Sequence, residues 1–363
     1  MIQWLDPLWR GTIVHEEPIC FSESDHFNFT GGSLLYTPRE ILKISSPDGT
    51  QQYEPVKDFQ WEGNTIIRTK NSSIPFLPRS LYCPPYIGEA DTSWLRLADQ
   101  SRYCKVFPEI IDYQVLVTYR HNEHWRGSIP CNQMSFLPLT LKKLTSNKSF
   151  RLVFYGDSIT AGWEASGYDE TVIDMVTLKE LRIRNHKPPF MPAWAELVTA
   201  ALKDYFHHNN LIKINRGAGG STSSWGSKHA ATIVSPENPD LVILAFGMNN
   251  LQQEAEEFKK DILDIISTIR HENPDCEFLL VSPMVPNPEI HGFMKNKLLD
   301  QERSLFQIQT SLTGIAVAPV HTIFLDLLNR DKNYLELTGN CINHPNDFSI
   351  RIYAQAILSC LGV

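Results

Sequence analysis

The chain has 363 residues, of which 42% are hydrophobic and 20% charged, and its formal net charge is -8. This composition is typical of a globular protein and not of a disordered or fibrous one. The negative charge and the lack of a Lys/Arg run argue against nucleic acid as a partner and do not favour an anionic membrane surface. No stretch approaches the roughly 18 apolar residues that a membrane-spanning helix requires.

Residues 1–145 are expected to form an antiparallel β-sandwich or jelly-roll domain with its linker. Residues 41–45, a turn at Asp48-Gly49 and a second alternating run together predict a hairpin. Residues 64–69 and 113–121 alternate β-branched and aromatic side chains, which predicts two more strands. The join to the second domain lies within the polar stretch 128–149.

Residues 146–363 are expected to form an α/β domain. Short apolar runs at 151–155, 211–214, 241–246 and 277–281 are typical of buried parallel strands. Amphipathic helices are expected at 193–205, 258–269 and 348–361. Strands that alternate with helices imply right-handed crossovers and a doubly wound parallel sheet.

Ligands of such sheets bind beyond the carboxyl ends of the strands, so the residues that follow each strand are informative. Ser158 lies on a tight turn after the first strand, as a nucleophile or as the N-cap of a helix. Gly220 ends a glycine-rich loop that either approaches a ligand or is a plain turn. Asn249 follows the third strand as an oxyanion donor or an Asx-turn residue, and His344 precedes a proline as a general base or a structural histidine.

In this order the four segments resemble the blocks of the SGNH (GDSL-type) hydrolase family. The similarity covers roughly residues 150–363 and extends to a bacterial subgroup with an N-terminal β-domain, in which carbohydrate acetyl esterases occur. It implies a flavodoxin-like sheet, the SGNH hydrolase fold, and a serine esterase. By this resemblance Ser158 is the nucleophile, His344 is the base, and Ser158, Gly220 and Asn249 form the oxyanion hole.

Two positions depart from the family pattern. Asn250 stands where the third block has an aspartate, and Cys341 stands where the last block has the acid that orients the histidine. Asp347 is close enough in sequence to replace that acid, although it could equally cap the last helix. A backbone carbonyl and a Ser-His dyad are the remaining alternative. Cys341 itself is either a small buried apolar residue or a redox-active thiol.

The expected function is hydrolysis of small acyl esters, acetyl above all, on a small substrate such as an acetylated saccharide. The alternatives are a lipase or thioesterase for longer chains and a glycan-binding protein with a weakened site. No cofactor or metal is expected, because the ligand-like pair His121 and His124 would face opposite sides of a strand. The polar insertion at 163–190 either shapes the pocket or makes an oligomer contact, and the oligomeric state stays open.

The cellular compartment is judged from the N-terminus and the cysteines. The start, MIQWLDPLWRG, lacks a basic region followed by an apolar one, so no secretory signal is expected. Seven scattered cysteines without a C-x-x-C pair are typical of reduced thiols. Both observations favour a cytoplasmic protein.

Overall fold

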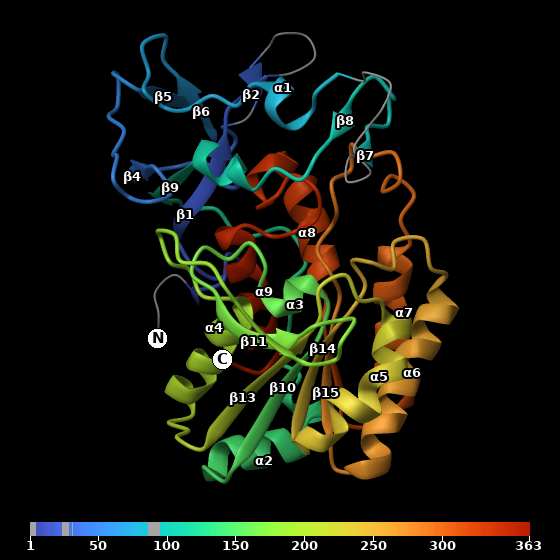
Figure 1. The fold of residues 1–363 in the computed structure, drawn as a ribbon. Coiled ribbons are helices and arrows are strands. Elements are labelled where there is room, and N and C mark those ends of the chain that lie inside the picture. Colours follow the sequence, from blue (N-terminus) through green and yellow to red (C-terminus); the bar gives the residue numbers. More distant parts are fainter. Residues whose placement is uncertain (1–4, 24–28, 31, 86–94) are drawn as a thin grey trace.

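The structure, a computed structural model, describes residues 5–23, 29–30, 32–85 and 95–363. Antiparallel β-structure from the first third of the chain lies at one end of the molecule, and an α/β domain lies at the other (Figure 1). Both parts were expected from the sequence and both are confirmed.

The N-terminal domain contains a three-stranded antiparallel sheet in which β9 (Gln114–Arg120) lies between β1 (Ile13–Cys20) and β4 (Glu40–Ser45). Short antiparallel pairs accompany it in the described part of the domain: β2 (Ser22–Glu23) with β3 (Phe29–Thr30), β5 (Phe59–Glu62) with β6 (Thr65–Arg68), and β7 (Leu95–Arg96) with β8 (Tyr103–Cys104). Helical segments in the described part of this domain include α1 (Arg79–Tyr82) and η2 (Pro108–Tyr113).

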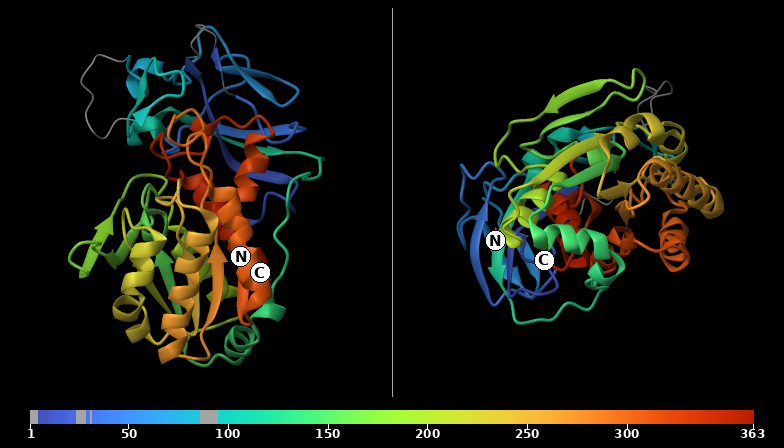
Figure 2. Two further views of the ribbon diagram at one scale, coloured as in Figure 1. Left: turned by 90° about the vertical axis from the view of Figure 1, so that its right-hand side faces the viewer. Right: turned by 90° about the horizontal axis from the view of Figure 1, so that it is seen from below.

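The turn at Asp48-Gly49 forms as expected, but the hairpin around it is short. After the turn only one isolated bridge, between Ser45 and Gln52, pairs the chain with β4. The full ladder of β4 is made with β9 instead, and residues 51–58 after the turn are irregular backbone with isolated bridges and a second turn. From β9 the chain runs along the α/β half to α2 (Pro138–Ser146), which crosses the boundary expected between residues 145 and 146 (Figure 2).

The α/β domain is built on five parallel strands. Their order across the sheet is β13 (Leu211–Gly217), β10 (Phe150–Gly156), β14 (Leu241–Ala245), β15 (Glu277–Val281) and β16 (Ile315–Ala318). In chain order this is 2-1-3-4-5, the flavodoxin-like arrangement, whose switch point lies between β10 and β14. The strand β16 was not expected, because its four residues carry only a short apolar signal.

Helices cover both faces of this sheet. Helices α4 (Trp194–Tyr205), α8 (Val320–Leu328) and α9 (Asp347–Cys360) share one apolar core with the sheet, and α5 (Ser223–Ile233), α6 (Ala255–Glu272) and α7 (Leu298–Ser311) share the other. Successive strand residues point to opposite faces, so Phe154 packs on Trp194 and Tyr155 on Phe246. Burial on both faces is why these strands are continuously apolar.

A buried ion cluster joins the N-terminal domain to the loop before α9. The ammonium of Lys332 lies 2.9 Å from carboxylate oxygens of both Glu17 in β1 and Glu336 in η5 (Tyr334–Glu336), and all three side chains are fully buried. Breaking a buried ion pair by removing one partner leaves a charge without compensation. The cluster therefore holds the start of the 333–346 loop against β1.

Candidate active site

The turn after β10 presents Ser158 at the switch point of the sheet. Ser158 is the first residue of α3 (Ser158–Ala161), and the cap of this helix is Asp157, whose Oδ1 accepts a hydrogen bond from the Ile159 N–H at 3.0 Å. The alternative that Ser158 caps the helix is therefore wrong. Its hydroxyl lies instead 2.9 Å from Nε2 of His344, at a site that is almost fully buried.

Asp157 is a buried carboxyl directly beside this serine. Burial raises its pKa from 3.8 to about 6, while the hydrogen bond from the Ile159 N–H and the charge of His344 pull it back in part. As the cap of α3, Asp157 satisfies a backbone N–H group at the start of the helix that carries Ser158.

His344 is held by a loop that is closed on itself. The side-chain oxygen of Asn340 accepts hydrogen bonds from three backbone N–H groups of this loop, including that of His344 at 3.1 Å. The carbonyl of His344 accepts from the Thr338 hydroxyl and the Gly339 N–H. The imidazole is thus presented by a rigid turn, and Asn340 is a site residue that sequence reasoning missed.

The carboxylate beside the other ring nitrogen is Glu164. Its Oε1 lies 3.4 Å from Nδ1 of His344. Asp347, the residue expected there, points elsewhere: its Oδ1 accepts from the Ser166 N–H at 2.9 Å. The expectation for Asp347 is corrected on this point, because its place in the first turn of α9 directs the side chain toward Ser166. The helix cap is Asn346, which accepts from the Ser349 N–H.

Cys341 has no exposed surface and packs in an apolar cluster with Cys20, Cys104 and Leu335. Burial raises the pKa of its thiol well above the ordinary value. A thiol in this state is neutral, so it supplies no negative charge to the imidazole. The structure thus favours the interpretation of Cys341 as a small buried apolar residue.

The two expected oxyanion donors lie on loops that are tied to the end of β10. Gly220 is exposed and has a φ of 79°, a conformation that glycine adopts without a Cβ penalty. The Asn249 amide donates one hydrogen bond to the Ser221 carbonyl at 2.9 Å, and the Ser221 hydroxyl donates to the Ala218 and Gly156 carbonyls. The second amide hydrogen of Asn249 is left for another acceptor.

Asn250, which replaces the family's aspartate, is buried in a hydrogen-bond network that includes one carboxylate, Asp261. Its Oδ1 accepts from the Ser223 N–H, and its amide donates to the Ser223 hydroxyl and to Gln253. Asp261 accepts from the same Ser223 hydroxyl and from Gln253. Because Asp261 already provides a negative charge here, an amide at position 250 satisfies the network without a second one.

The insertion at 163–190 forms a hairpin of β11 (Asp169–Ile173) and β12 (Glu180–Arg184) that lies against the end of β13 (Figure 1). The Met175 carbonyl accepts from the indole N–H of Trp225, and the Met175 thioether lies next to Gly220. Trp163 meets the ring of His344 edge-on, with 5.9 Å between centroids, and lies next to Gly219.

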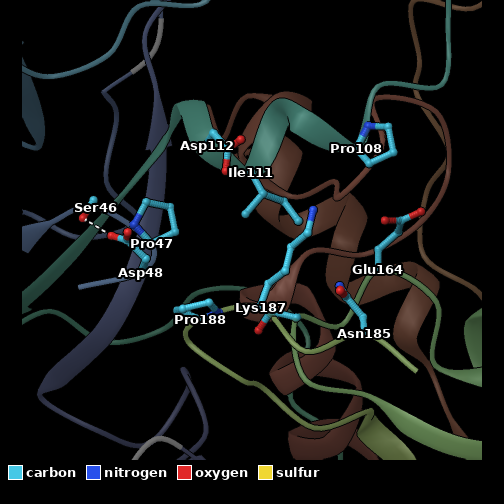
Figure 3. A pocket seen from close by; sticks show the side chains of 11 residues that line it. Ser46, Pro47, Asp48, Pro108, Ile111, Asp112, Glu164, Asn185, Lys187 and Pro188 are labelled. Atoms are coloured by element: carbon cyan, nitrogen blue, oxygen red, sulfur yellow. Dashed lines mark hydrogen bonds between the residues drawn. The ribbon is translucent and has the colours of Figure 1, made fainter. Parts of the chain in front are cut away.

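Two cavities border these residues. A groove of about 540 Å³ is lined by several polar side chains, among them Thr222, Ser224, Asn249, Gln252 and Asn343, and by the apolar residues Met248, Leu251 and Phe293. A second cavity of about 420 Å³ lies between the two domains, with Glu164 in its wall (Figure 3). Within the described ranges, no group of three or more His, Cys, Asp or Glu side chains could hold a metal ion. No helix in the part of the chain that the structure describes is long and apolar enough to cross a membrane.

Comparison with protein families gives a match over residues 154–348 to the GDSL-like lipase/acylhydrolase family. No curated protein matches the sequence.

Among solved structures, the chain is similar to a two-domain esterase active on acetylated mannans, with 20% identity, a TM-score of 0.48, and coverage of 65% of this chain and 55% of that one. It thus spans about half the length of that esterase. It is also similar to an acetylxylan esterase from Geobacillus stearothermophilus, with 17% identity, a TM-score of 0.45, and coverage of 59% and 94%.

Proposed function

Because the chain belongs to the GDSL-like lipase/acylhydrolase family and is thus a carboxylic ester hydrolase, we propose that it removes short acyl groups, acetyl first, from carbohydrate alcohols. The proposal places the chemistry at Ser158. The observation that carries it is the 2.9 Å contact between the Ser158 hydroxyl and Nε2 of His344, at the switch point of the sheet.

In the proposed reaction, Ser158 Oγ attacks the ester carbonyl while His344 Nε2 takes the hydroxyl proton. The negative charge that develops on the carbonyl oxygen meets the N–H groups of Ser158 and Gly220 and the free amide hydrogen of Asn249. His344 then gives its proton to the leaving alcohol. Water hydrolyses the acyl-enzyme by the same steps in reverse order, with His344 again as the base.

Apolar side chains beside the glycine loop support a short acyl group. The thioether of Met175 lies 3.9 Å from where a Cβ on Gly220 would be, and Trp163 lies 3.4 Å from the same point on Gly219. We expect an acyl group bound against this loop to contact these two side chains. Each further methylene would have to displace one of them.

The polar groove supports a polyhydroxylated alcohol. Since His344 protonates the leaving oxygen, the alcohol has to lie on the Nε2 side, and the groove is lined by Asn249 and by Asn343, the residue directly before His344. Amide and hydroxyl groups can donate to and accept from sugar hydroxyls. The half-exposed indole of Trp163 adds a flat apolar surface beside the ring of His344.

The test is acetate release from acetylated oligosaccharides, with acetyl, butyryl and octanoyl p-nitrophenyl esters as a chain-length series. We expect the rate to fall steeply from acetyl to octanoyl and to vanish in Ser158→Ala. A preference for octanoyl esters would support the lipase or thioesterase alternative. Glycan binding without any turnover would support the weakened-site alternative and refute the proposal.

A further inference from the structure

We propose that Glu164 is the positioning residue that orients His344 and stabilises its protonated form, in place of the acid that the family carries at position 341. The inference rests on the proposed function of Ser158 and His344. The imidazole is held from both ends: Nε2 lies 2.9 Å from the Ser158 hydroxyl, and Nδ1 lies 3.4 Å from Glu164 Oε1. A carboxylate at Nδ1 keeps that proton in place, so Nε2 is free to accept one from the serine.

The contact between Glu164 Oε1 and His344 Nδ1, at 3.4 Å, is longer than most hydrogen bonds. Hydrogen bonds of this kind usually measure about 2.7–3.2 Å, and catalytic ones are often long before substrate binds and tighten in the complex. Both side chains are largely shielded, with 11% of His344 and 18% of Glu164 exposed. Salt screens the charge of a carboxylate in this position only weakly. The charge therefore acts on the imidazole at a distance of 3.4 Å.

The backbone at Glu164 gives an independent reason to assign it a role. Its φ is 70°, a left-handed conformation that costs a side chain such as glutamate free energy and that glycine adopts freely. Such conformations persist where surrounding structure enforces them, and they occur often at functional sites. Here the conformation turns the side chain of residue 164 back from the end of the nucleophile turn toward the histidine loop.

The histidine loop leaves space for this side chain. Gly339 lies under it, and a Cβ on Gly339 would come within 2.7 Å of Glu164 Cβ. The same Gly339 donates its N–H to the His344 carbonyl at 2.9 Å. The loop that holds the imidazole thus also contacts the Glu164 side chain. A side chain at position 339 would therefore disturb the contact between Glu164 and His344.

Glu164 also borders the cavity of about 420 Å³ between the domains, which gives small solutes a path to it (Figure 3). Asp112, on η2, lines the same cavity. Asp112 is therefore a matched control: a carboxylate in the same cavity that belongs to the N-terminal domain.

The titratable and charged groups that surround the pair come from several elements. They are Asp157 beside His344, and Tyr168, Lys187, Asp48 and Asp112 around Glu164. Each stays unchanged in the Glu164 variants, so a shift of the pH profile in those variants reports on Glu164 itself.

The first experiment measures kcat/KM for p-nitrophenyl acetate against pH. We expect Glu164→Gln to lose about 10²-fold, less than the roughly 10⁴-fold seen where a fully buried triad acid is changed. The acidic limb of its profile of kcat/KM against pH should move to lower pH by about one unit, because the protonated His344 ring loses the negative charge of Glu164. Glu164→Asp keeps the charge and should keep the wild-type limb, and Asp112→Asn should keep both rate and limb.

The second experiment separates positioning from folding. Glu164→Gly removes the carboxylate but suits the left-handed backbone, so its thermal midpoint should not fall below that of the wild type although its rate does. Formate, which can enter through the cavity, should restore part of the lost rate in this variant, whereas formamide should not. Gly339→Ala should slow the wild type, because a Cβ there would meet Glu164 Cβ at 2.7 Å and the Pro345 carbonyl oxygen at 3.0 Å, and its effect should be smaller in the Glu164→Gly background, where only the second contact remains.

Several results would overturn the assignment of Glu164. Full activity of Glu164→Gln with an unmoved acidic limb would do so, as would a Glu164→Gly variant that loses rate only in proportion to its loss of folded protein. These outcomes leave the proposed function standing, since the wild type still turns over and Ser158→Ala does not.

If the wild type hydrolyses no ester, the pairing of Glu164 with His344 is tested by an NMR titration of the His344 ring in the wild type and in Glu164→Gln. The ring should protonate at lower pH in the variant, and equal titrations would refute the pairing.

Discussion

Replacing Asp347 with Asn tests stability and the choice of acid in one variant. Burial raises the pKa of the Asp347 carboxyl from 3.8 to about 6, against the opposing hydrogen bond from the Ser166 N–H and the charge of Arg351. Because the folded protein holds this proton more tightly than the unfolded chain does, the stabilisation is complete below about pH 4 and is lost as pH rises through about 6. At about 1.4 kcal/mol per tenfold change in proton affinity, the loss at pH 8 is about 3 kcal/mol.

Asparagine at position 347 keeps a side-chain oxygen that can accept the hydrogen bond from the Ser166 N–H. It carries no charge, so its burial does not cost the free energy of desolvating a carboxylate. We therefore expect Asp347→Asn to exceed the wild type in free energy of unfolding at pH 8 by up to about 3 kcal/mol, with the difference shrinking toward pH 4. Urea titrations at pH 4.5, 6 and 8 measure this, and the contribution of Asp157 cancels because both proteins share it. Esterase activity should stay within a few-fold of the wild type. A loss of 10³-fold or more would make Asp347 the orienting acid, and a stability difference independent of pH would refute the burial argument.

Three further substitutions test other parts of the site. Asn249→Ala should lower kcat by about 10²–10³-fold with a small change in KM, because it removes one oxyanion donor; an unchanged kcat on p-nitrophenyl acetate would exclude it from the oxyanion hole. Met175→Ala should raise the ratio of butyryl to acetyl turnover by about 10-fold or more, since the truncation removes the thioether and its methyl group beside the glycine loop, and an unchanged ratio would place the acyl group elsewhere. Asn250→Asp should cost about 1–3 kcal/mol of stability in chemical denaturation, because a carboxylate would face Gln253 Oε1 in a network that already holds the Asp261 carboxylate. Equal stability would contradict this.

Much of the α/β domain could be predicted, because its strands are buried on both faces and helices such as α4 and α6 have one apolar face. Those patterns depend on burial alone, and they indicated four of the five parallel strands. The helix expected at 348–361 forms, but it is buried on all sides and is not amphipathic. The strand β16 and the hairpin of β11 and β12 were missed. Strand β16 is only four residues long. The hairpin of β11 and β12 lies in a polar and charged segment, a composition that is typical of a loop.

Some of the site residues could be predicted from the sequence and others could not. Ser158, Gly220, Asn249 and His344 follow strands or precede a helix in a recognisable order, so their segments stand out in the sequence. Glu164 does not, because its role depends on a left-handed backbone and on a glycine at position 339, far along the chain. Asp347 was the nearer carboxyl in sequence, but three residues after His344 it already belongs to a helix that points it away.

Covalent labelling with a fluorophosphonate, read by intact mass and peptide mapping, tests the nucleophile directly. The wild type should gain one label, on the peptide that contains Ser158. Ser158→Ala should gain none there, and His344→Ala should react far more slowly because the serine has lost its base. An unlabelled Ser158 in folded, wild-type protein, or a label that persists in Ser158→Ala, would contradict the assignment of this serine.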